Sequence, residues 1–363
     1  MSKSTNMFTD MVKKMGADVH FASEELHSAQ YSGTMDTGSY VLNAATSGSI
    51  FGGIPTNKVV QYAGPSTTGK TFFALGIVTS FQKANPEGVV IYFDTEAAVT
   101  RQMMSDRGID PSRVVVIEPE TIQDFRMRAL QAIKMYSETP VEKRLPMMFV
   151  LDSLGQLSSI KEMEDSESGS NTRDMTKQQL IRGAFRTIRL RLAKIDCPMI
   201  MTNHTYEVIG AFRPTQTASG GGGPKFTSDI VQMLSKAKDR KSSVDHTVIG
   251  NIITVRNEKN RIAKENTAVR VKLSYDTGLD RHFGLLDLAL VGGLVKKTPS
   301  GKKYIMPNGK EYFESAVYKD PTKHFTDEFL QQIDEVAQSI FSYGDDSEES
   351  AVDLDAVLEE ADG

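Results

Sequence analysis

The sequence predicts an α/β fold, with a central, mostly parallel sheet that carries helices on both faces. Three observations predict it. Apolar segments rich in β-branched residues alternate with segments of helical periodicity, a glycine-rich loop separates the first such strand from the first helix, and several strands end in polar residues. Strands that alternate with helices pair in parallel, and such a sheet binds ligands at the carboxyl ends of its strands.

The first predicted strand and helix enclose a phosphate-binding loop (P-loop). NKVVQYA, residues 57–63, is apolar and β-branched, and GKTFFALGIVTSFQKA, residues 69–84, has apolar residues at helical intervals. The intervening GPSTTGKT fits G-x-x-x-x-G-K-[ST], in which backbone N–H groups converge on phosphate oxygens and Lys70 bridges the β and γ phosphates. An accidental match to a glycine-rich turn is the alternative. The predicted nucleoside-triphosphate site consists of Gly64, Pro65, Ser66, Thr67, Thr68, Gly69, Lys70 and Thr71.

The next strand, GVVIYFD, ends in a carboxylate at Asp94, and Glu96 follows two residues later. We expect this strand to lie beside the P-loop strand, so that Glu96 can hold and deprotonate an attacking water. The alternative is that Asp94 or Glu96 only caps the next helix. The strand RVVVIEP and a helix that begins at Thr121, with Asp124 three residues later, complete this part of the pattern.

Two further strands also end in polar side chains. LPMMFVLDS ends at Asp152, which is placed as a Walker B carboxylate to hold Mg²⁺ together with the Thr71 hydroxyl. A cap on the following turn is the alternative. CPMIMTNH ends at Asn203 and His204, where a polar side chain can sense a γ-phosphate, although a lone histidine is more often structural.

Two long segments, residues 155–174 and 205–228, follow these strands. Both exceed the ~12 to 15 residues beyond which a structureless loop is usually functional or disordered. The first is acidic overall, which phosphate contact does not explain. The second mixes aromatic, cationic and glycine residues, which suits it to a sugar-phosphate backbone. Its candidate DNA-binding residues are Tyr206, Phe212, Arg213, Gly220, Gly221, Gly222, Gly223 and Lys225.

The helix KQQLIRGAFRTIRLRLAKI lies between these two segments and is basic. Arg182, Arg186 and Arg189 share one of its faces because they are spaced i, i+4, i+7. A solvated face is the commoner meaning of this pattern, and phosphate contact is the alternative.

The pattern changes after Ser228. DIVQMLSKAKD, HTVIGNIITVRN and AVRVKLSYD read as strands that extend the sheet, and the core is expected to end around Asp276. A helix (FGLLDLALVGGLV), a hairpin with an Asn308-Gly309 turn and a last helix (TDEFLQQIDEVAQSIFSY) follow. The predicted organisation is an N-terminal arm (1–35), a core (36–275), a small C-terminal α+β unit (276–343) and an acidic tail (344–363).

The composition is that of a soluble globular protein, with 39% hydrophobic and 25% charged residues. The single cysteine, Cys197, has no intrachain partner and begins an apolar run, so we expect a buried, inert thiol and a reducing, cytoplasmic setting. No run approaches the ~20 apolar residues of a membrane span. The polar start MSKSTNMFTDMVKK lacks the hydrophobic region of a signal peptide.

Acidic charge is concentrated at the C-terminal end. Residues 344–363 hold nine acidic residues and no lysine or arginine. Removing these nine charges from a net charge of −5 leaves +4 on the rest of the chain. Such a block is usually solvated and disordered; the alternative is a regulatory tail that competes with an anionic ligand for basic surface.

Over roughly residues 40 to 295, these motifs together resemble the RecA family of strand-exchange recombinases, and within it the phage UvsX-like branch. GPSTTGKT is similar to the family's P-loop, YFDTEAA to the segment with its catalytic glutamate, and FVLDSLGQL to its Walker B strand. IKEMEDSESGSNTRDMT and NHTYE resemble the UvsX-like branch more specifically.

The resemblance implies a RecA-like P-loop ATPase core in which Lys70, Glu96 and His204 are catalytic. Glu96 is then the general base, and His204 is a γ-phosphate sensor coupled to DNA. Segments 156–174 and 205–228 are implied as the two DNA-binding loops.

The resemblance to the RecA family also implies residues that contact the neighbouring subunit and a residue near the adenine of ATP. NEKNRIA implies that Lys259 and Arg261 reach the ATP of the neighbouring subunit. Residues 1–35 are implied as the oligomerisation arm that docks on the next protomer. Met103 departs from the family, because relatives often place an aromatic residue near the adenine there.

The expected function is that of a DNA-dependent ATPase that forms filaments on single-stranded DNA and exchanges strands with homologous duplex DNA in recombination and repair. The implied cofactors are ATP and Mg²⁺. The implied partners are single- and double-stranded DNA, further copies of the chain in filaments or rings, a mediator and a single-stranded-DNA-binding protein, in the cytoplasm of a phage-infected bacterium. The alternatives are a ring-forming RecA-fold helicase and a non-catalytic recombination mediator.

Overall fold

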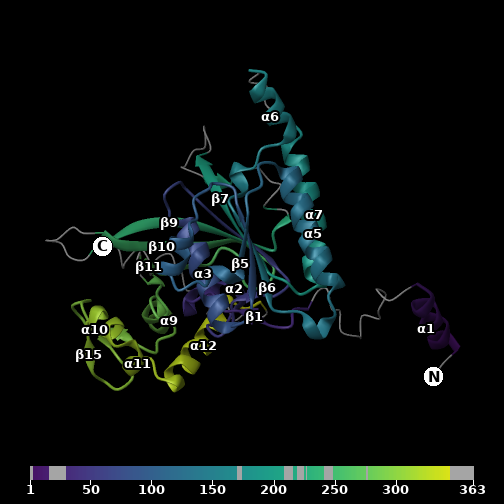
Figure 1. Cartoon of the computed structure of the whole chain (residues 1–363). Helices are drawn as coiled ribbons and strands as arrows, with labels where there is room; N and C mark the ends of the chain where they lie inside the picture. Colours follow the sequence, from purple (N-terminus) through teal and green to yellow (C-terminus); the bar gives the residue numbers. More distant parts are fainter. Residues whose placement is uncertain are drawn as a thin grey trace.

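The centre of the fold is one large sheet with helices on both of its faces (Figure 1). The computed structural model describes residues 3–15, 30–169, 174–207, 216–218, 225, 227–240, 248–274 and 277–343. Within these residues the sheet has ten strands. In spatial order they are β12 (Gly278–Leu279), β11 (Ala268–Ser274), β10 (Val248–Asn260), β9 (Ile230–Arg240), β3 (Val59–Gly64), β7 (Met199–Glu207), β6 (Met147–Asp152), β4 (Val89–Asp94) and β5 (Val114–Ile117), with β8 (Gln216–Ala218) paired to β7.

The strands from β5 to β9 in this order are parallel, and β10, β11 and β12 continue the sheet antiparallel. The predicted α/β class with a mostly parallel sheet is therefore confirmed. One expectation is wrong: β4 does not lie beside the P-loop strand β3, because β7 and β6 separate them. Alternation of strands and helices predicts parallel pairing, but it does not determine the order in which crossovers place the strands.

The helices cover both faces of the sheet. α5 and α7 pack together on one face, and α2, α3 and α12 lie on the other (Figure 1). The helices in chain order are α1 (Lys3–Met15), α2 (Tyr40–Ser47), α3 (Lys70–Ala84), α4 (Arg101–Asp106), α5 (Ile122–Glu138), α6 (Ile160–Glu167), α7 (Lys177–Lys194), α9 (Leu285–Val291), α10 (Glu314–Lys319), α11 (Pro321–His324) and α12 (Asp327–Phe341), with 3₁₀ turns at Pro111–Arg113, Val141–Lys143 and Leu154–Gln156.

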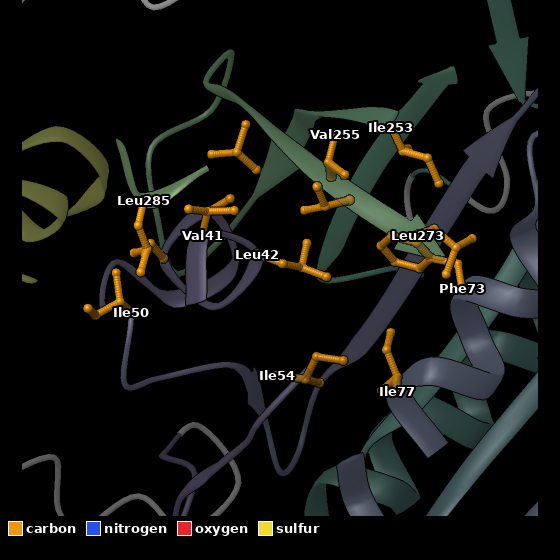
Figure 2. Packing of buried hydrophobic residues seen from close by; sticks show 14 of the residues in the cluster. Val41, Leu42, Ile50, Ile54, Phe73, Ile77, Ile253, Val255, Leu273 and Leu285 are labelled. Carbon is orange, nitrogen blue, oxygen red and sulfur yellow. The ribbon is translucent and has the colours of Figure 1, made fainter. Parts of the chain in front are cut away.

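Two hydrophobic cores follow from the alternation of side chains along the strands. In β4, Tyr92 faces the core under α3, while Phe93 faces the core under α5 and α7. Figure 2 shows the first core, where Leu42 of α2 and Phe73 of α3 lie in one cluster with Leu273 of β11. These side chains are fully buried, and burial of each stabilises the fold by about 1.5 to 3 kcal/mol. The sheet that carries the candidate site is thus fixed from both sides.

The C-terminal residues share the first core. Phe341 of α12 belongs to it, and the Asp334 carboxylate accepts hydrogen bonds from Ser49 Oγ and Ile50 N, both 2.7 Å away. β12 pairs with β11, so the sheet continues past the expected end of the core at residue 275. A small antiparallel sheet of β13 (Lys296–Lys297), β14 (Tyr304–Ile305) and β15 (Glu311–Tyr312) lies outside the large one.

The N-terminal helix α1 lies apart from the rest of the described chain (Figure 1). Four apolar side chains of α1 are exposed: Met7 (67%), Phe8 (54%), Met11 (48%) and Met15 (62%). The other parts of the expected arm, residues 1–2 and 16–29, and the acidic tail 344–363 lie outside the described residues. None of the described helices combines the length and the apolar character needed to span a membrane.

Candidate active site

The P-loop follows β3 directly, and its backbone requires small residues. A Cβ on Gly64 would meet the carbonyl oxygen of Leu234 at 2.7 Å, and Gly69, just before α3, has a φ of +93°. Thr67 at the tip also has a left-handed φ, +63°. The Thr68 hydroxyl donates to Pro65 O at 2.6 Å and braces the loop. The loop therefore presents its N–H groups, and the positive end of α3, to a phosphate.

Lys70 is the buried cation of this loop, with 6% of its surface exposed. Its ammonium donates to Gly64 O at 3.1 Å and Pro65 O at 2.9 Å, and it lies 3.4 Å from His204 Nδ1. Burial lowers the pKa of Lys70, and the nearby carboxylate of Glu96 opposes this shift. The two carbonyl contacts hold the ammonium inside the P-loop, where it would face a phosphate bound there.

Glu96 and His204 are in direct contact. His204 Nε2 lies 2.9 Å from Glu96 Oε1, and Ser153 Oγ donates to the same oxygen at 2.6 Å. Because the ammonium of Lys70 can only donate, His204 Nδ1 accepts from it and Nε2 carries the proton toward Glu96. Burial raises the pKa of Glu96, but the hydrogen bonds from Ser153 and His204, with the charge of Lys70, outweigh it and lower the pKa overall. Glu96 is therefore a carboxylate, the form that accepts a proton.

Asp94 holds the loop that carries Glu96. Its buried carboxylate accepts backbone N–H groups from Glu96 (3.1 Å) and Val99 (3.0 Å). The next helix, α4, is capped instead by Thr100, which accepts from Met103 N at 3.1 Å. Asp94 is thus a loop-forming residue that orients Glu96, and this contact brings Glu96 to the site although β4 is two strands away from β3.

Asp152 ends β6 and is nearly fully buried, with 2% exposed. Its carboxylate accepts hydrogen bonds from Tyr92 Oη at 2.9 Å, from Thr202 Oγ1 and from Thr71. Burial raises the pKa of Asp152, and these hydroxyl donors oppose the shift. The hydrogen bond between Thr71 and Asp152 places a hydroxyl and a carboxylate together, and these oxygen donors fit a Mg²⁺ ion that arrives with a triphosphate.

Lys236 contacts the P-loop, whereas Met103 contacts the first core. Met103, in α4, is half-buried and packs against the first core; on the next turn, the Arg107 guanidinium lies 4.3 Å from the centre of the Phe72 ring. Lys236, on β9, donates to the carbonyl of Thr67 and to Thr67 Oγ1 (3.0 Å) at the P-loop tip. We did not expect Lys236 at the site, because only the pairing of β9 beside β3 brings it there.

The first expected DNA-binding segment, 156–174, contains the helix α6 and is not the structureless loop that we expected (Figure 1). Ser159 and Glu162 form a reciprocal cap at its start, and Ser159 Oγ also donates to Asp174 at 2.6 Å. Lys177 pairs with Glu162 at 2.9 Å. Two of the acidic residues, Glu162 and Asp174, which phosphate contact did not explain, therefore stabilise the start of this helix.

The second expected segment, 205–228, begins at the end of β7. Tyr206 is 60% exposed and pairs with β8 in an antiparallel turn-back of the chain. Lys225 forms an ion pair with Glu258 at 2.7 Å. The remaining predicted residues of this segment, Phe212, Arg213, Gly220, Gly221, Gly222 and Gly223, lie outside the described residues.

The three arginines of α7 line a cavity of about 490 Å³. Gln179, Gly183 and Thr227 complete its lining. Arg189 is bound to Asp229 through contacts of 2.5 and 2.9 Å. This face is thus partly an ion-paired surface, with Arg182 and Arg186 beside the end of the second segment.

Lys259 and Arg261 lie at the edge of the sheet opposite the P-loop. β10 runs antiparallel to β9 and brings them beside Ile230, which pairs with Val60 near the start of β3. The P-loop begins at the other end of β3, at Gly64, about 13 Å away at ~3.3 Å per residue. Within one chain, these two cations are therefore too far from the P-loop to contact a phosphate bound there.

Comparisons with known proteins agree with this arrangement. The family model described as "RecA N-terminal domain" matches residues 8–280. The chain is 30% identical to the "Recombination and repair protein" of Enterobacteria phage T4 over 72% of this chain and 64% of that protein. It is 27% identical to "Protein RecA" of Cereibacter sphaeroides over 79% and 80% of the two chains, and 29% identical to that of Ruegeria pomeroyi over 74% and 73%.

The match to the phage T4 protein thus spans less than two thirds of that relative. The matched region nevertheless includes the P-loop, Glu96, Asp152, His204 and Lys259, in a fold whose strands bring the first four together. The chain belongs to the RecA family, as a UvsX-like member.

Proposed function

We propose that this chain is a DNA-dependent ATPase that assembles on single-stranded DNA and exchanges strands with homologous duplex DNA. One observation carries the proposal: β7 places His204 against Lys70 and Glu96, and two residues later it places Tyr206, exposed, at the start of the segment 205–228. A displacement of this segment by DNA therefore moves the same strand that carries His204. Family membership supports this reading of the strand.

ATP, when bound with Mg²⁺, supplies the triphosphate whose terminal phosphoryl group is transferred to water. The P-loop backbone and Lys70 would hold its phosphates, and Thr71 and Asp152 would hold the metal. Glu96, kept ionised by Ser153 and His204, would orient the attacking water and accept its proton. His204 would report the occupant of the site to segment 205–228.

Assembly is proposed to complete the site. Lys259 and Arg261 are about one strand length from their own P-loop, so they reach a triphosphate only when another copy presents one. The exposed apolar face of α1, made of Met7, Phe8 and Met11, supports docking on a second copy, because these side chains are about half exposed or more and α1 lies apart from the large sheet (Figure 1). The edge strand β5 offers Val115 (48% exposed) and Val116 (44%) as a matching apolar surface.

DNA contact is proposed through the second segment and the cavity of α7. Arg182 and Arg186 line this cavity with Thr227, close to where the segment rejoins the sheet. Guanidinium groups suit phosphate, and Tyr206 can stack on a base. Single-stranded and then duplex DNA are the proposed ligands; a mediator and a single-stranded-DNA-binding protein are the proposed protein partners in the host cytoplasm.

The decisive variant is Glu96→Gln, which keeps the shape of the side chain and removes its basicity. We expect it to bind ATP and single-stranded DNA like the wild type and to lose DNA-stimulated hydrolysis by about 10² to 10⁴-fold. Electron microscopy with an ATP analogue, with and without single-stranded DNA, should show DNA-bound filaments for both proteins. Full ATP turnover by the variant contradicts the assigned role of Glu96. Recombination that is stimulated equally by the variant and the wild type favours a non-catalytic mediator, and duplex unwinding by hexamers without strand exchange favours a helicase.

A further inference from the structure

Asp229 is a buried carboxylate surrounded by cations at the edge of the sheet opposite the P-loop. Its side chain is 1% exposed and accepts the backbone N–H of Val59 at 3.1 Å. Arg189 Nη2 approaches it to 2.5 Å and Arg189 Nε to 2.9 Å, while Arg261 Nη1 lies 3.4 Å away. Two arginines therefore share one carboxylate, with unequal contacts.

Lys259 is bound to the same turn of the chain. Its ammonium donates to the carbonyl oxygens of Lys225 (2.8 Å) and Ser228 (2.6 Å), the residues that lead into Asp229. The side chain of Lys225 in turn pairs with Glu258, the residue before Lys259. Both proposed trans cations are thus held by Lys225, Ser228 and Asp229, at and just after the end of the second DNA-binding segment.

The unequal contacts indicate which partner separates more easily. Arg189 makes charge-assisted bonds through two nitrogens, and such bidentate pairs are the stronger ones. Arg261 has a single, longer contact, and 48% of its side chain is exposed. A shift of residues 225–229 relative to β10 would release Arg261 and Lys259, while Arg189 would keep the charge of Asp229 compensated.

We propose that Asp229 is a positioning residue that restrains Arg261, beside Lys259, until DNA occupies the segment 205–228. Binding of DNA to this segment shifts residues 225–229 and frees both cations for the triphosphate of the adjacent subunit. This inference rests on the proposed function and adds its regulation: the counter-ion of the trans cations, Asp229, directly follows the DNA-binding segment in the chain.

The first test is Asp229→Asn, which removes the charge and keeps a carbonyl oxygen for the Val59 N–H. Hydrolysis without DNA should rise about tenfold, a small part of the ~10³ to 10⁵-fold effect of a cation supplied in trans, while the rate with saturating single-stranded DNA stays within about twofold. The matched control is Asp287→Asn, which removes the carboxylate of a similarly buried pair with Arg270 (3.1 Å) away from the site. A DNA-free rate in Asp229→Asn equal to that of the wild type overturns the proposal.

The second test has the opposite sign. Arg189→Gln leaves Arg261 as the arginine that contacts Asp229, with the charges of Lys58 and Lys259 nearby. Arg261 should then be held more firmly, so the DNA-free rate should fall and more DNA should be needed for half-maximal hydrolysis. In the double variant Asp229→Asn with Arg261→Ala, the gain of the single variant should disappear. If Asp229→Asn does not fold, Arg189→Gln still decides, because unchanged rates in it contradict the restraint.

A third readout needs no ATP. Amine labelling followed by mass spectrometry, without nucleotide, should find Lys259 protected in the free wild type and more reactive when single-stranded DNA is added. Lys303, which precedes the small-sheet strand β14 directly, is the internal reference. Unchanged reactivity of Lys259 with bound DNA overturns the proposal. A wild type that binds DNA but never hydrolyses ATP contradicts the proposed function instead, so the two failures are distinguishable.

Discussion

The charged groups at the two ends of the strands of the central sheet, the carboxyl edge and the amino edge, have different partners. At the carboxyl edge, Lys70 is held by backbone carbonyls and Glu96 by the side chains of Ser153 and His204, so the P-loop N–H groups remain available for an anion. At the amino edge, Arg261 is already paired with Asp229. One chain therefore has a preformed P-loop at the carboxyl edge, and at the amino edge it has two cations, Lys259 and Arg261, that are already bound by the chain itself.

The strongest test of this division is to remove the restrained cations. Arg261→Ala or Lys259→Ala should lower DNA-stimulated hydrolysis by about 10³ to 10⁵-fold, because a cation supplied in trans is worth that much, and ATP binding should persist. Steady-state hydrolysis and nucleotide binding measure this.

Mixing the two classes of variant makes that test specific. Glu96→Gln and Arg261→Ala should each be inactive alone, yet a mixture should recover hydrolysis at interfaces that join an intact Glu96 to an intact Arg261. If well-formed mixed filaments do not recover hydrolysis, Glu96 and Arg261 do not act on the same ATP from different subunits.

A smaller effect is expected from His204→Asn, which removes the link between the cradle and β7. Single-stranded DNA should stimulate hydrolysis less than in the wild type, because His204 contacts both Lys70 and Glu96 and asparagine cannot reach both. Nucleotide binding by the P-loop should change little. If DNA stimulates the variant as much as the wild type, His204 does not couple the nucleotide site to segment 205–228.

The pH dependence tests the environment of Glu96. Its pKa lies below the ordinary value, so it stays ionised, and active, until the pH falls below the usual carboxylate range. Ser153→Ala removes a hydrogen bond that lowers this pKa, so the acidic limb of the rate profile should move to higher pH. The reference is the wild-type protein, because both proteins keep the contact between His204 and Glu96. If the acidic limbs of the two rate profiles coincide, the assigned role of Ser153 is wrong.

The smallest effect concerns the acidic tail. Deletion of residues 344–363 removes nine negative charges and should tighten binding of single-stranded DNA a few-fold and change its salt dependence, because fixed carboxylates no longer compete with phosphates. Salt titrations of the full-length and shortened proteins measure this. Identical titrations would show that the tail does not reach the basic surface.

Much of the fold follows from local pattern. The P-loop, the strand ends at Asp94 and Asp152, and the Thr121 cap, whose hydroxyl accepts from Asp124 N at 3.1 Å, all arise from residues close in sequence. The contacts that local pattern could not give depend on strand order. These include Lys236 at the P-loop tip and Asp229 beside Arg261, which are joined only through the pairing of β9 with β3 and β10.

The α6 segment shows a different limit of sequence reasoning. Phosphate contact did not explain its acidic residues, although Ser159 and Glu162, three residues apart, fit the local capping pattern S-x-x-E. Asp174 lies fifteen residues after Ser159, and only the folded chain brings its carboxylate to the start of the helix. Short-range propensity therefore underestimates order where capping partners come from both ends of a segment.

The shared C-terminal core has a practical consequence for anyone who shortens this protein. A cut after residue 276 would remove Asp334 from the turn at Ser49 and Phe341 from the first core, and would leave an apolar surface open to water. Tyr343 Oη still donates to Asn260 O at 2.9 Å, one residue from Arg261. The safe place to trim is therefore beyond Tyr343.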